Sequence, residues 1–338
     1  MHVTTQITTQ VTRYIAALFV VGLIATCIAN ASPAASSATA RTRTRPSPAA
    51  VTVTGHVHAT NGTQTLANLA VAIDDSTTST DADGTFSARL PPASPVRLRL
   101  TGGIVPRELS VAAGAAGDVE VDAIALSSGF DLAFYRQLVR NGFDAPKHLE
   151  ALRRWKIDPR IYLRTVDDAG TAIDQKTLDS TEATIRETIP MWTAGTFKAA
   201  LIERGTEERV GWDAWITVRW PSVAGPEGIC GSADVGRPGG EIRLYYKSSS
   251  CSCPAGPQVR PRTVRHEVGH AMGFWHTDSA GDLMAGIGVA GCDQRPSPRE
   301  LAHAAIAYHR PVGNLDPDTD PDSVPSASIS VSPARVVP

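Results

Sequence analysis

Short runs of alternating apolar and polar residues fill positions 51–126. The runs are VTVTGHVHA, LAVAID, GTFSARL, VRLRL, RELSVAA and DVEVDAIAL, and turn-forming stretches such as DADG and LPPASP separate them. A period of two places every second side chain on one face of a strand, and repeated turn signals at this spacing are typical of small all-β domains. The pattern predicts an antiparallel β-sandwich at 51–126.

The pattern becomes helical after residue 126. Leu132, Phe134, Leu138 and Val139 form an apolar stripe within 127–158, which predicts a helical connector. At 159–313 the predicted strands are RIYLRTVD, AWITVRW and EIRLYY. The predicted helices there are KTLDSTEATIRETIPMWT, the segment that begins at His266, and SPRELAHAAIAYH. A sheet with helices on one side is an α+β arrangement. Together with the β-sandwich at 51–126, it predicts a chain of more than one domain.

The N-terminal segment has the order of a signal peptide. Arg13 precedes an apolar run from Tyr14 to Ala29, and Ala29-Asn30-Ala31 offers small residues for cleavage. We predict a signal peptide at 1–31 and a flexible linker at 32–50, where large apolar side chains are almost absent. The mature protein is then secreted and has no stable membrane span. Surface anchoring through an uncleaved signal or a lipid on Cys27 is the alternative.

The C-terminal segment 314–338 has no helical period and is predicted to be a disordered tail. Asp316, Asp318, Asp320 and Asp322 alternate as calcium ligands do, but the flanking prolines and the missing loop glycine favour a solvated acidic tail. Calcium binding by these residues is therefore possible in principle but unsupported by the pattern.

Charge and cysteine content narrow the partners and the compartment. A net charge of −2 over 338 residues gives no electrostatic reason to expect nucleic acid or an anionic membrane as partner. Cys230, Cys251, Cys253 and Cys292 remain after signal removal, and an even number in an exported chain predicts two disulfides. Cys251 and Cys253 are too close to pair together, so each is expected to reach Cys230 or Cys292. A cysteine zinc site is the alternative, which the irregular spacing disfavours.

The stretch HEVGHAMGFWH at 266–276 contains a metal-binding pattern. His266 and His270 lie four residues apart and share one face of a helix, and Glu267 lies beside that face without ligating. A catalytic zinc needs a third protein ligand and one open position. Gly273 can adopt a positive φ, end the helix and reverse the chain, which brings His276 back to the metal. The pattern predicts a zinc site with three histidine ligands.

The full pattern H-E-x-x-H-x-x-G-x-x-H resembles that of the metzincin metalloproteases. Met284 follows in SAGDLMAG, eight residues after His276, a spacing similar to that of the Met-turn in the matrixin branch. The resemblance implies one catalytic Zn²⁺ held by His266, His270 and His276, with Glu267 as general base, within a twisted sheet, an active-site helix and a C-terminal helix. Gly286 stands where two other branches carry a tyrosine, so no tyrosine ligand is expected.

A second resemblance concerns the first domain. GHVHATNG, LAVAIDD and TDADGTFSARLP resemble the carboxypeptidase regulatory-like, transthyretin-type domain. The resemblance implies a binding or spacer module without catalytic residues. His56 and His58 lie on one face of a predicted strand, where two-ligand metal binding is conceivable but an exposed polar face is favoured.

These expectations together predict a secreted zinc endopeptidase. Zinc would activate a water, and Glu267 would take its proton. The expected partner is a protein or peptide substrate, which an edge strand at 241–246 would hold extended by main-chain pairing. The alternatives are a zinc amidase acting on cell-wall peptides and a non-catalytic cell-surface binding protein with a structural zinc site. The sequence gives no indication of oligomeric state.

Overall fold

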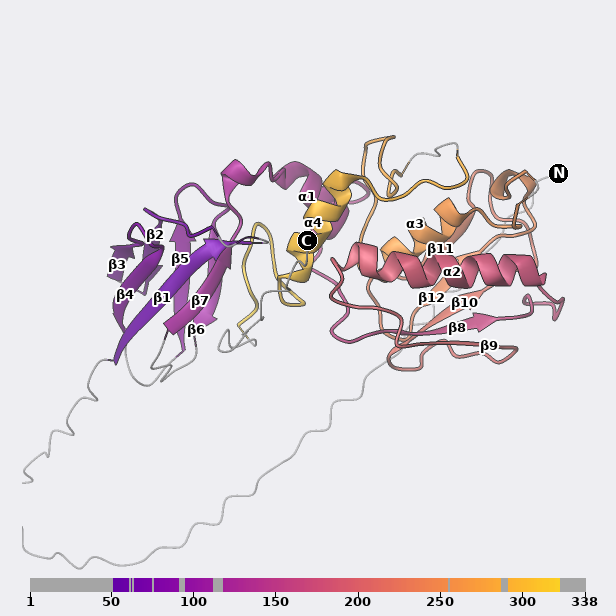
Figure 1. Cartoon of the computed structure of the whole chain (residues 1–338), viewed down its shortest axis with the longest axis horizontal. Helices are drawn as coiled ribbons and strands as arrows, with labels where there is room; N and C mark the ends of the chain where they lie inside the picture. Colours follow the sequence, from indigo (N-terminus) through magenta and orange to yellow (C-terminus); the bar gives the residue numbers. More distant parts are fainter. Residues whose placement is uncertain are drawn as a thin grey trace, which may run out of the picture. The chain divides into compact units, whose positions relative to one another are not determined.

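The structure is a computed structural model that describes residues 51–322, except 61, 63, 75, 91–94, 112–117, 255 and 287–290. The predicted signal peptide, the linker at 32–50 and the tail residues 323–338 lie outside the described residues. All described residues belong to one unit, Ser47–Pro338. Within them the fold is mixed α/β, with three sheets and four α-helices (Figure 1).

Two of the sheets come from residues 51–123. One has the strand order β4-β1-β7 and the other the order β3-β2-β5-β6. Alternate residues of these strands are buried, as in β5, and both sheets contribute to one hydrophobic cluster that includes Val57, Val71, Leu100 and Val121. The strands are β1 (Val51–Ala59), β2 (Ala70–Ile73), β3 (Ser76–Ser79), β4 (Thr85–Leu90), β5 (Val96–Thr101), β6 (Arg107–Val111) and β7 (Asp118–Ala123).

The prediction of a purely antiparallel domain is wrong at one pair of strands. β1 and β7 run parallel, with Gly55 opposite Val119. Parallel neighbours need a long connection, and here the chain passes through β2 to β6 before it returns beside β1. The alternating pattern showed where the strands lie but carried no information on which strands pair.

The third sheet is mostly parallel and has the order β11-β12-β10-β8-β9. Only β11 runs antiparallel to its neighbour, β12. The prediction that 241–246 forms an edge strand is wrong, because β12 lies between β10 and β11, and the edge is β11. These strands are β8 (Arg160–Arg164), β9 (Leu201–Gly205), β10 (Trp215–Arg219), β11 (Gly231–Ala233) and β12 (Glu241–Leu244).

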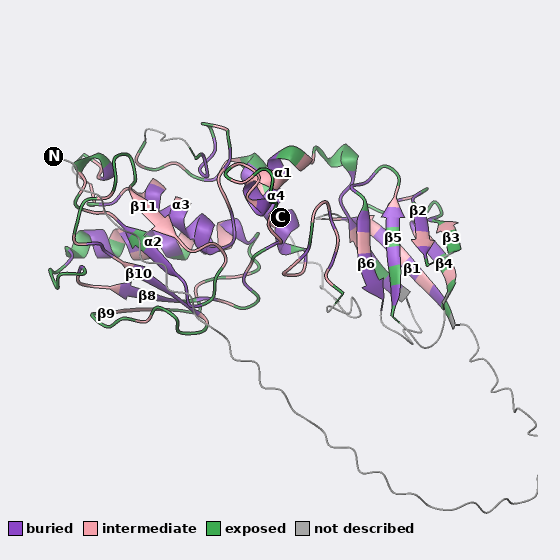
Figure 2. Cartoon of the chain, turned by 180° about the vertical axis from the view of Figure 1, so that it is seen from behind, coloured by how far each residue is buried: buried purple, intermediate pink, exposed green. Residues whose placement is uncertain are grey.

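The four α-helices share one hydrophobic core with this sheet. α3 packs on α2 and lies along β11 and β12. Leu178, Ile185 and Ile189 of α2 belong to the same cluster as apolar residues of β8, β10 and all the other α-helices. Figure 2 shows buried positions along β10 and α3. The helices are α1 (Leu132–Arg140), α2 (Gln175–Trp192), α3 (Pro261–Ala271) and α4 (Pro298–Tyr308), with short 3₁₀ turns η1 (Leu126–Ser128) and η2 (Ser249–Cys251).

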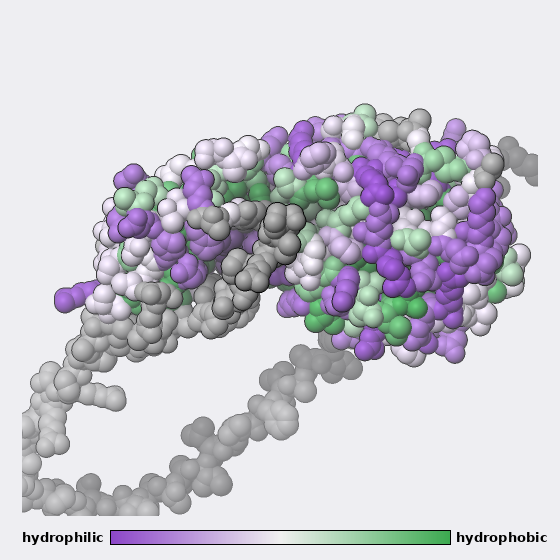
Figure 3. Space-filling model, in the orientation of Figure 1, coloured by the Kyte–Doolittle hydropathy of each residue, from purple (hydrophilic) through white to green (hydrophobic). Residues whose placement is uncertain are grey.

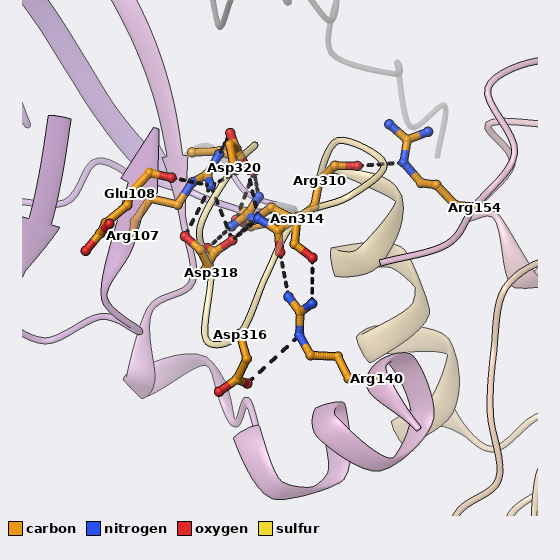
Figure 4. Close-up of polar contacts among 11 residues, drawn as sticks. Arg107, Glu108, Arg140, Arg154, Arg310, Asn314, Asp316, Asp318 and Asp320 are labelled. Carbon is orange, nitrogen blue, oxygen red and sulfur yellow. Dashed lines mark hydrogen bonds and ion pairs between the residues drawn. The ribbon is translucent and has the colours of Figure 1, made fainter. Parts of the chain in front are cut away.

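The prediction of a disordered tail at 314–338 is wrong for residues 314–322, which are part of the fold. Asn314, Asp318 and Asp320 are almost completely buried. The carboxylates are neutralised by arginines: Arg107 Nη2 donates to Asp320 Oδ2 at 2.6 Å, and Arg310 Nε donates to Asp318 Oδ1 at 2.6 Å (Figure 4). Asp318 and Asp320 of this acidic segment (residues 314–322) are therefore buried within the fold, since their charges are paired with arginines instead of being hydrated.

Arg310 also connects this segment to the first two sheets. It follows α4 and is fully buried. Its Nη1 donates to Asp122 Oδ2 at 2.5 Å, and its Nη2 donates to Thr60 Oγ1 at 3.1 Å. One guanidinium thus bonds to side chains from β7, from the turn after β1 and from the acidic segment. We use the name ionic cluster for Arg107, Asp122, Arg310, Asp318 and Asp320.

The four cysteines after residue 200 form two disulfides among the described residues. Cys230 bonds to Cys251 and Cys253 bonds to Cys292, and paired cysteines are typical of oxidising environments. Among the described residues, no helix combines the length and hydropathy needed to cross a membrane. On the face drawn in Figure 3, hydrophilic residues cover much of the surface and hydrophobic residues gather in small separate areas.

Candidate metal centre

Three histidines meet beside α3. His266 and His270 lie on one face of the helix, and His276 returns to them from the following loop. One ring nitrogen from each of the three lies within 4.8 Å of the others. His270 Nε2 and His276 Nε2 are only 3.2 Å apart. All three histidines named by the sequence pattern are therefore in one place.

The return of His276 depends on Gly273. α3 ends at Ala271, and Gly273 has a φ of +113°, which side chains rarely tolerate. A Cβ atom at this position would also come within 2.1 Å of the Arg153 carbonyl oxygen. Glycine is thus required here by both the backbone angle and the close approach of another segment.

Hydrogen bonds fix the orientation of each imidazole ring. Nδ1 of His266 lies 2.8 Å from the Leu283 carbonyl oxygen, and Nδ1 of His270 lies 2.7 Å from the Phe274 carbonyl oxygen. Nδ1 of His276 lies 2.9 Å from Asp144 Oδ2. Because these oxygens only accept hydrogen bonds, each neutral ring carries its proton on Nδ1 and leaves Nε2 bare.

The bare nitrogens test whether the site fits a metal ion. Two lone pairs 3.2 Å apart repel each other unless a cation lies between them. Nitrogens bound to tetrahedral zinc at its usual bond length are separated by about 3.3 Å. Histidine ligands of metals also donate their second ring proton to an oxygen, as all three do here. The residues present therefore fit a zinc ion.

Glu267 lies beside the histidines on α3 and is buried. It is 4% exposed, and Oε2 has no hydrogen-bond partner among the described residues. Burial raises its pKa to about 8, against the opposing charge of Arg262. Burial lowers the pKa of His266 to about 4 and also lowers that of His270, so both rings are neutral at pH 7, as metal ligands must be.

Met284 lies beneath the helix in a tight turn. It is fully buried, and a Cβ atom at Gly269 would come within 2.6 Å of its sulfur. Glu300, at the start of α4, accepts hydrogen bonds from the backbone N–H groups of Leu283 and Met284. The same turn presents the Leu283 carbonyl oxygen to His266. The turn and α4 together hold the carbonyl oxygen that orients His266.

The segment predicted as a helical connector, residues 127–158, contacts His276 and its neighbours. The Leu138 carbonyl oxygen accepts a hydrogen bond from Trp275 N at 2.7 Å, and Asp144 bonds to His276. Phe143 fills the space beside Gly286, since a Cβ atom there would come within 2.5 Å of its ring. A side chain at position 286 would require the Phe143 ring to move, which accounts for the glycine found there.

Sequence reasoning missed three residues of this site: Asp144, Gly231 and Glu300. Asp144 is 132 positions from His276 and belongs to no motif. Gly231 lies on β11, where a Cβ atom would come within 2.5 Å of Glu267 Oε1 and 2.6 Å of Cγ. Only Glu300 had a local signal, because it forms a capping box with Ser297.

Comparisons with known proteins add little to this geometry. No family model matches the sequence, and a search of curated proteins found no match. Among solved structures, the chain is similar to metalloproteinase-II from Bacteroides fragilis, with 13% identity and a TM-score of 0.31. The similarity covers 75% of this chain and 84% of that one. The function must therefore be inferred from the three histidines and Glu267.

Proposed function

We propose that this chain is a secreted zinc endopeptidase of the matrixin-like metzincin type. His266, His270 and His276 would hold the ion, and Met284 would be the Met-turn residue. The observation that carries the proposal is the convergence of three bare Nε2 atoms beside Glu267, a buried carboxylate without a partner among the described residues. Zinc bound there would lower the pKa of a water and polarise the peptide carbonyl.

Glu267 would serve as the proton carrier. Burial alone raises the pKa of Glu267 to about 8, and a zinc cation bound beside it would lower that pKa, so Oε2 could then accept a proton from the attacking water and pass it to the leaving amine. Burial keeps competing water away from the carboxylate, and Gly231 leaves the space that its side chain occupies. A purely structural zinc site would have no use for such a group.

The edge strand β11 offers a place for the substrate. It lies at the end of the five-stranded sheet and packs beside α3. Its residues, Gly231, Ser232 and Ala233, are small and half-buried. An extended peptide could pair with this edge by main-chain hydrogen bonds and bring its scissile bond to the histidines.

The remaining assignments belong to the same proposal. Residues 1–31 would be the signal peptide, 32–50 a linker, 51–126 a carboxypeptidase regulatory-like accessory domain, and 127–158 a helical connector to a metzincin-like catalytic domain at 159–313. The two disulfides support export. The shared core of the two smaller sheets supports an accessory β-domain.

A glutamate variant tests the mechanism. In Glu267→Ala the chain should still bind zinc, while cleavage of an unfolded protein such as reduced casein falls by about 100-fold or more. Glu227→Ala, on an exposed loop, is the matched control and should cleave normally. Unchanged cleavage in Glu267→Ala would refute the proposed mechanism.

The two alternatives are outcomes of further measurements on the same protein. Hydrolysis of cell-wall peptides without cleavage of unfolded proteins would identify a zinc amidase. A zinc ion coordinated by four protein side chains, with no peptide hydrolysis of any kind, would identify a structural site on a binding protein.

A further inference from the structure

A second group of potential metal ligands lies far from α3 in the sequence. His56 and His58 are two residues apart on β1, so their side chains share one face of the sheet. Glu120 of β7 lies directly opposite His56 in the parallel β1–β7 pair. One ligand atom from each of the three lies within 4.8 Å of the others. The strand register therefore gathers two imidazoles and a carboxylate at one point.

The two histidines approach the same carboxylate oxygen. Glu120 Oε2 lies 3.3 Å from His56 Nδ1 and 3.6 Å from His58 Nδ1. Ligand atoms around a tetrahedral transition metal are separated by about 3.3 Å. The two rings are 6.4 Å apart and inclined by 26°, so both can direct Nδ1 toward Glu120.

The second nitrogen of His56 is already engaged. Nε2 lies 2.7 Å from the Asp83 carbonyl oxygen, which only accepts hydrogen bonds. Asp83 belongs to a turn in which Asp81 Oδ1 accepts hydrogen bonds from the Asp83 and Thr85 amides, so this carbonyl is held in place. The neutral ring therefore carries its proton on Nε2 and presents a bare Nδ1 to the Glu120 oxygen.

A bare nitrogen 3.3 Å from a carboxylate oxygen places two acceptors face to face. Either a proton or a metal ion must lie between them. A backbone carbonyl that accepts the proton of the second ring nitrogen, as the Asp83 carbonyl does for His56 Nε2, is typical of metal-binding histidines. The three side chains are 33%, 32% and 57% exposed, which leaves room for water to complete the coordination.

We propose that His56, His58 and Glu120 bind a divalent transition-metal ion, separate from the centre at His266. Two imidazoles and one carboxylate suit Zn²⁺, Ni²⁺ and Cu²⁺. The ion links β7, at the edge of its sheet, to the central strand β1. Because the ligands come together only in the folded sheet, the ion stabilises this part of the chain.

The test uses the mature chain in which His266→Ala and His270→Ala remove the first centre. Isothermal titration with Ni²⁺ alone should show one saturable equivalent, and adding His58→Gln should weaken binding by more than 10-fold. His148→Gln changes an exposed histidine and is the matched control, which should leave the titration unchanged. The midpoint of thermal unfolding should rise with Ni²⁺ in the parent variant but not after His58→Gln.

A second set of titrations replaces the first if the double alanine variant does not fold. The unaltered chain should then bind two equivalents of Ni²⁺, and Glu120→Gln should bind one. Equal Ni²⁺ titrations with and without His58→Gln, or the same number of equivalents in the unaltered chain and in Glu120→Gln, would overturn the proposal and identify the group as a protonated ion pair. Neither result depends on peptidase activity, so this site and the proposed function can fail separately.

Discussion

Replacing Arg310 by methionine removes the central cation of the ionic cluster. The guanidinium donates twice to Asp318, through Nε at 2.6 Å and Nη2 at 2.9 Å, and once to Asp122 at 2.5 Å. Methionine has a similar length but no charge, so it leaves both carboxylates without their main partner. Asp318 is 1% exposed and cannot regain water.

The size of the loss depends on which contacts remain. Breaking a buried ion pair by removing one partner costs about 3–5 kcal/mol. Asp318 keeps Arg107 Nη1 at 3.3 Å and Asn314 Nδ2 at 3.1 Å, and the side chain of Asp122 is 20% exposed. We therefore expect the lower end, about 3 kcal/mol, which lowers the unfolding midpoint by roughly 6 °C in a chain of this size.

Urea unfolding followed by tryptophan fluorescence measures the change in free energy. Arg186→Met is the control, because Arg186 forms an exposed ion pair with Glu182 within α2 and should lose less than about 1 kcal/mol. Adding Asp318→Asn to Arg310→Met should recover part of the loss, since no fully buried carboxylate then lacks its arginine. Equal losses in Arg310→Met and Arg186→Met would show that the buried cluster contributes no more than a surface pair.

Three further predictions concern the site and the response to pH. Asp144→Ala should weaken zinc binding by about 10-fold or more in competition with a chelating dye, because His276 loses the acceptor of its Nδ1 proton; affinity equal to that of the unaltered chain would contradict this role. Gly231→Ala should displace the Glu267 carboxylate, so kcat falls while zinc content is unchanged; full activity would refute it. Burial raises the pKa of Asp122, but Arg310 and Arg107 outweigh burial and lower it from 3.8 to about 2. The stability that this carboxylate adds should be present above about pH 4 and lost as the pH falls toward about 2. In urea unfolding at a series of pH values, the free energy of unfolding should fall less steeply over this range in Asp122→Asn than in the unaltered chain, and equal slopes would contradict the prediction.

The features that the sequence predicted correctly are local. The runs at 160–167, 214–220 and 241–246 contain β8, β10 and β12, and α4 begins at Pro298 with the Ser297 cap, because period and capping depend on neighbouring residues. The spacing of the histidines and Gly273 is also local, so their meeting could be predicted from helix geometry. The metal identity and the catalytic role of Glu267 stay predictions.

The features that the sequence could not show depend on distant partners. The segment containing Asp318 and Asp320 has the composition of a solvated tail, and only pairing with Arg107 and Arg310 makes its burial favourable. Similarly, β11 is three residues of GSA without an apolar pattern, so nothing local marks it as the edge strand. The carboxylate of Asp144 reaches His276 from a segment that the apolar stripe identified only as a helix and its following loop.

The helix α4 connects these long-range features. In its first turn, Glu300 accepts hydrogen bonds from the Leu283 and Met284 backbone N–H groups. This contact also holds the Leu283 carbonyl oxygen, which lies against Nδ1 of His266. Just beyond its last turn Arg310 bonds to Asp318 and to Asp122 of β7. A helix fixed by buried carboxylates at both ends has little freedom to slide or rotate. The acidic segment is therefore linked to His266 only through α4, which it contacts at the end opposite Glu300.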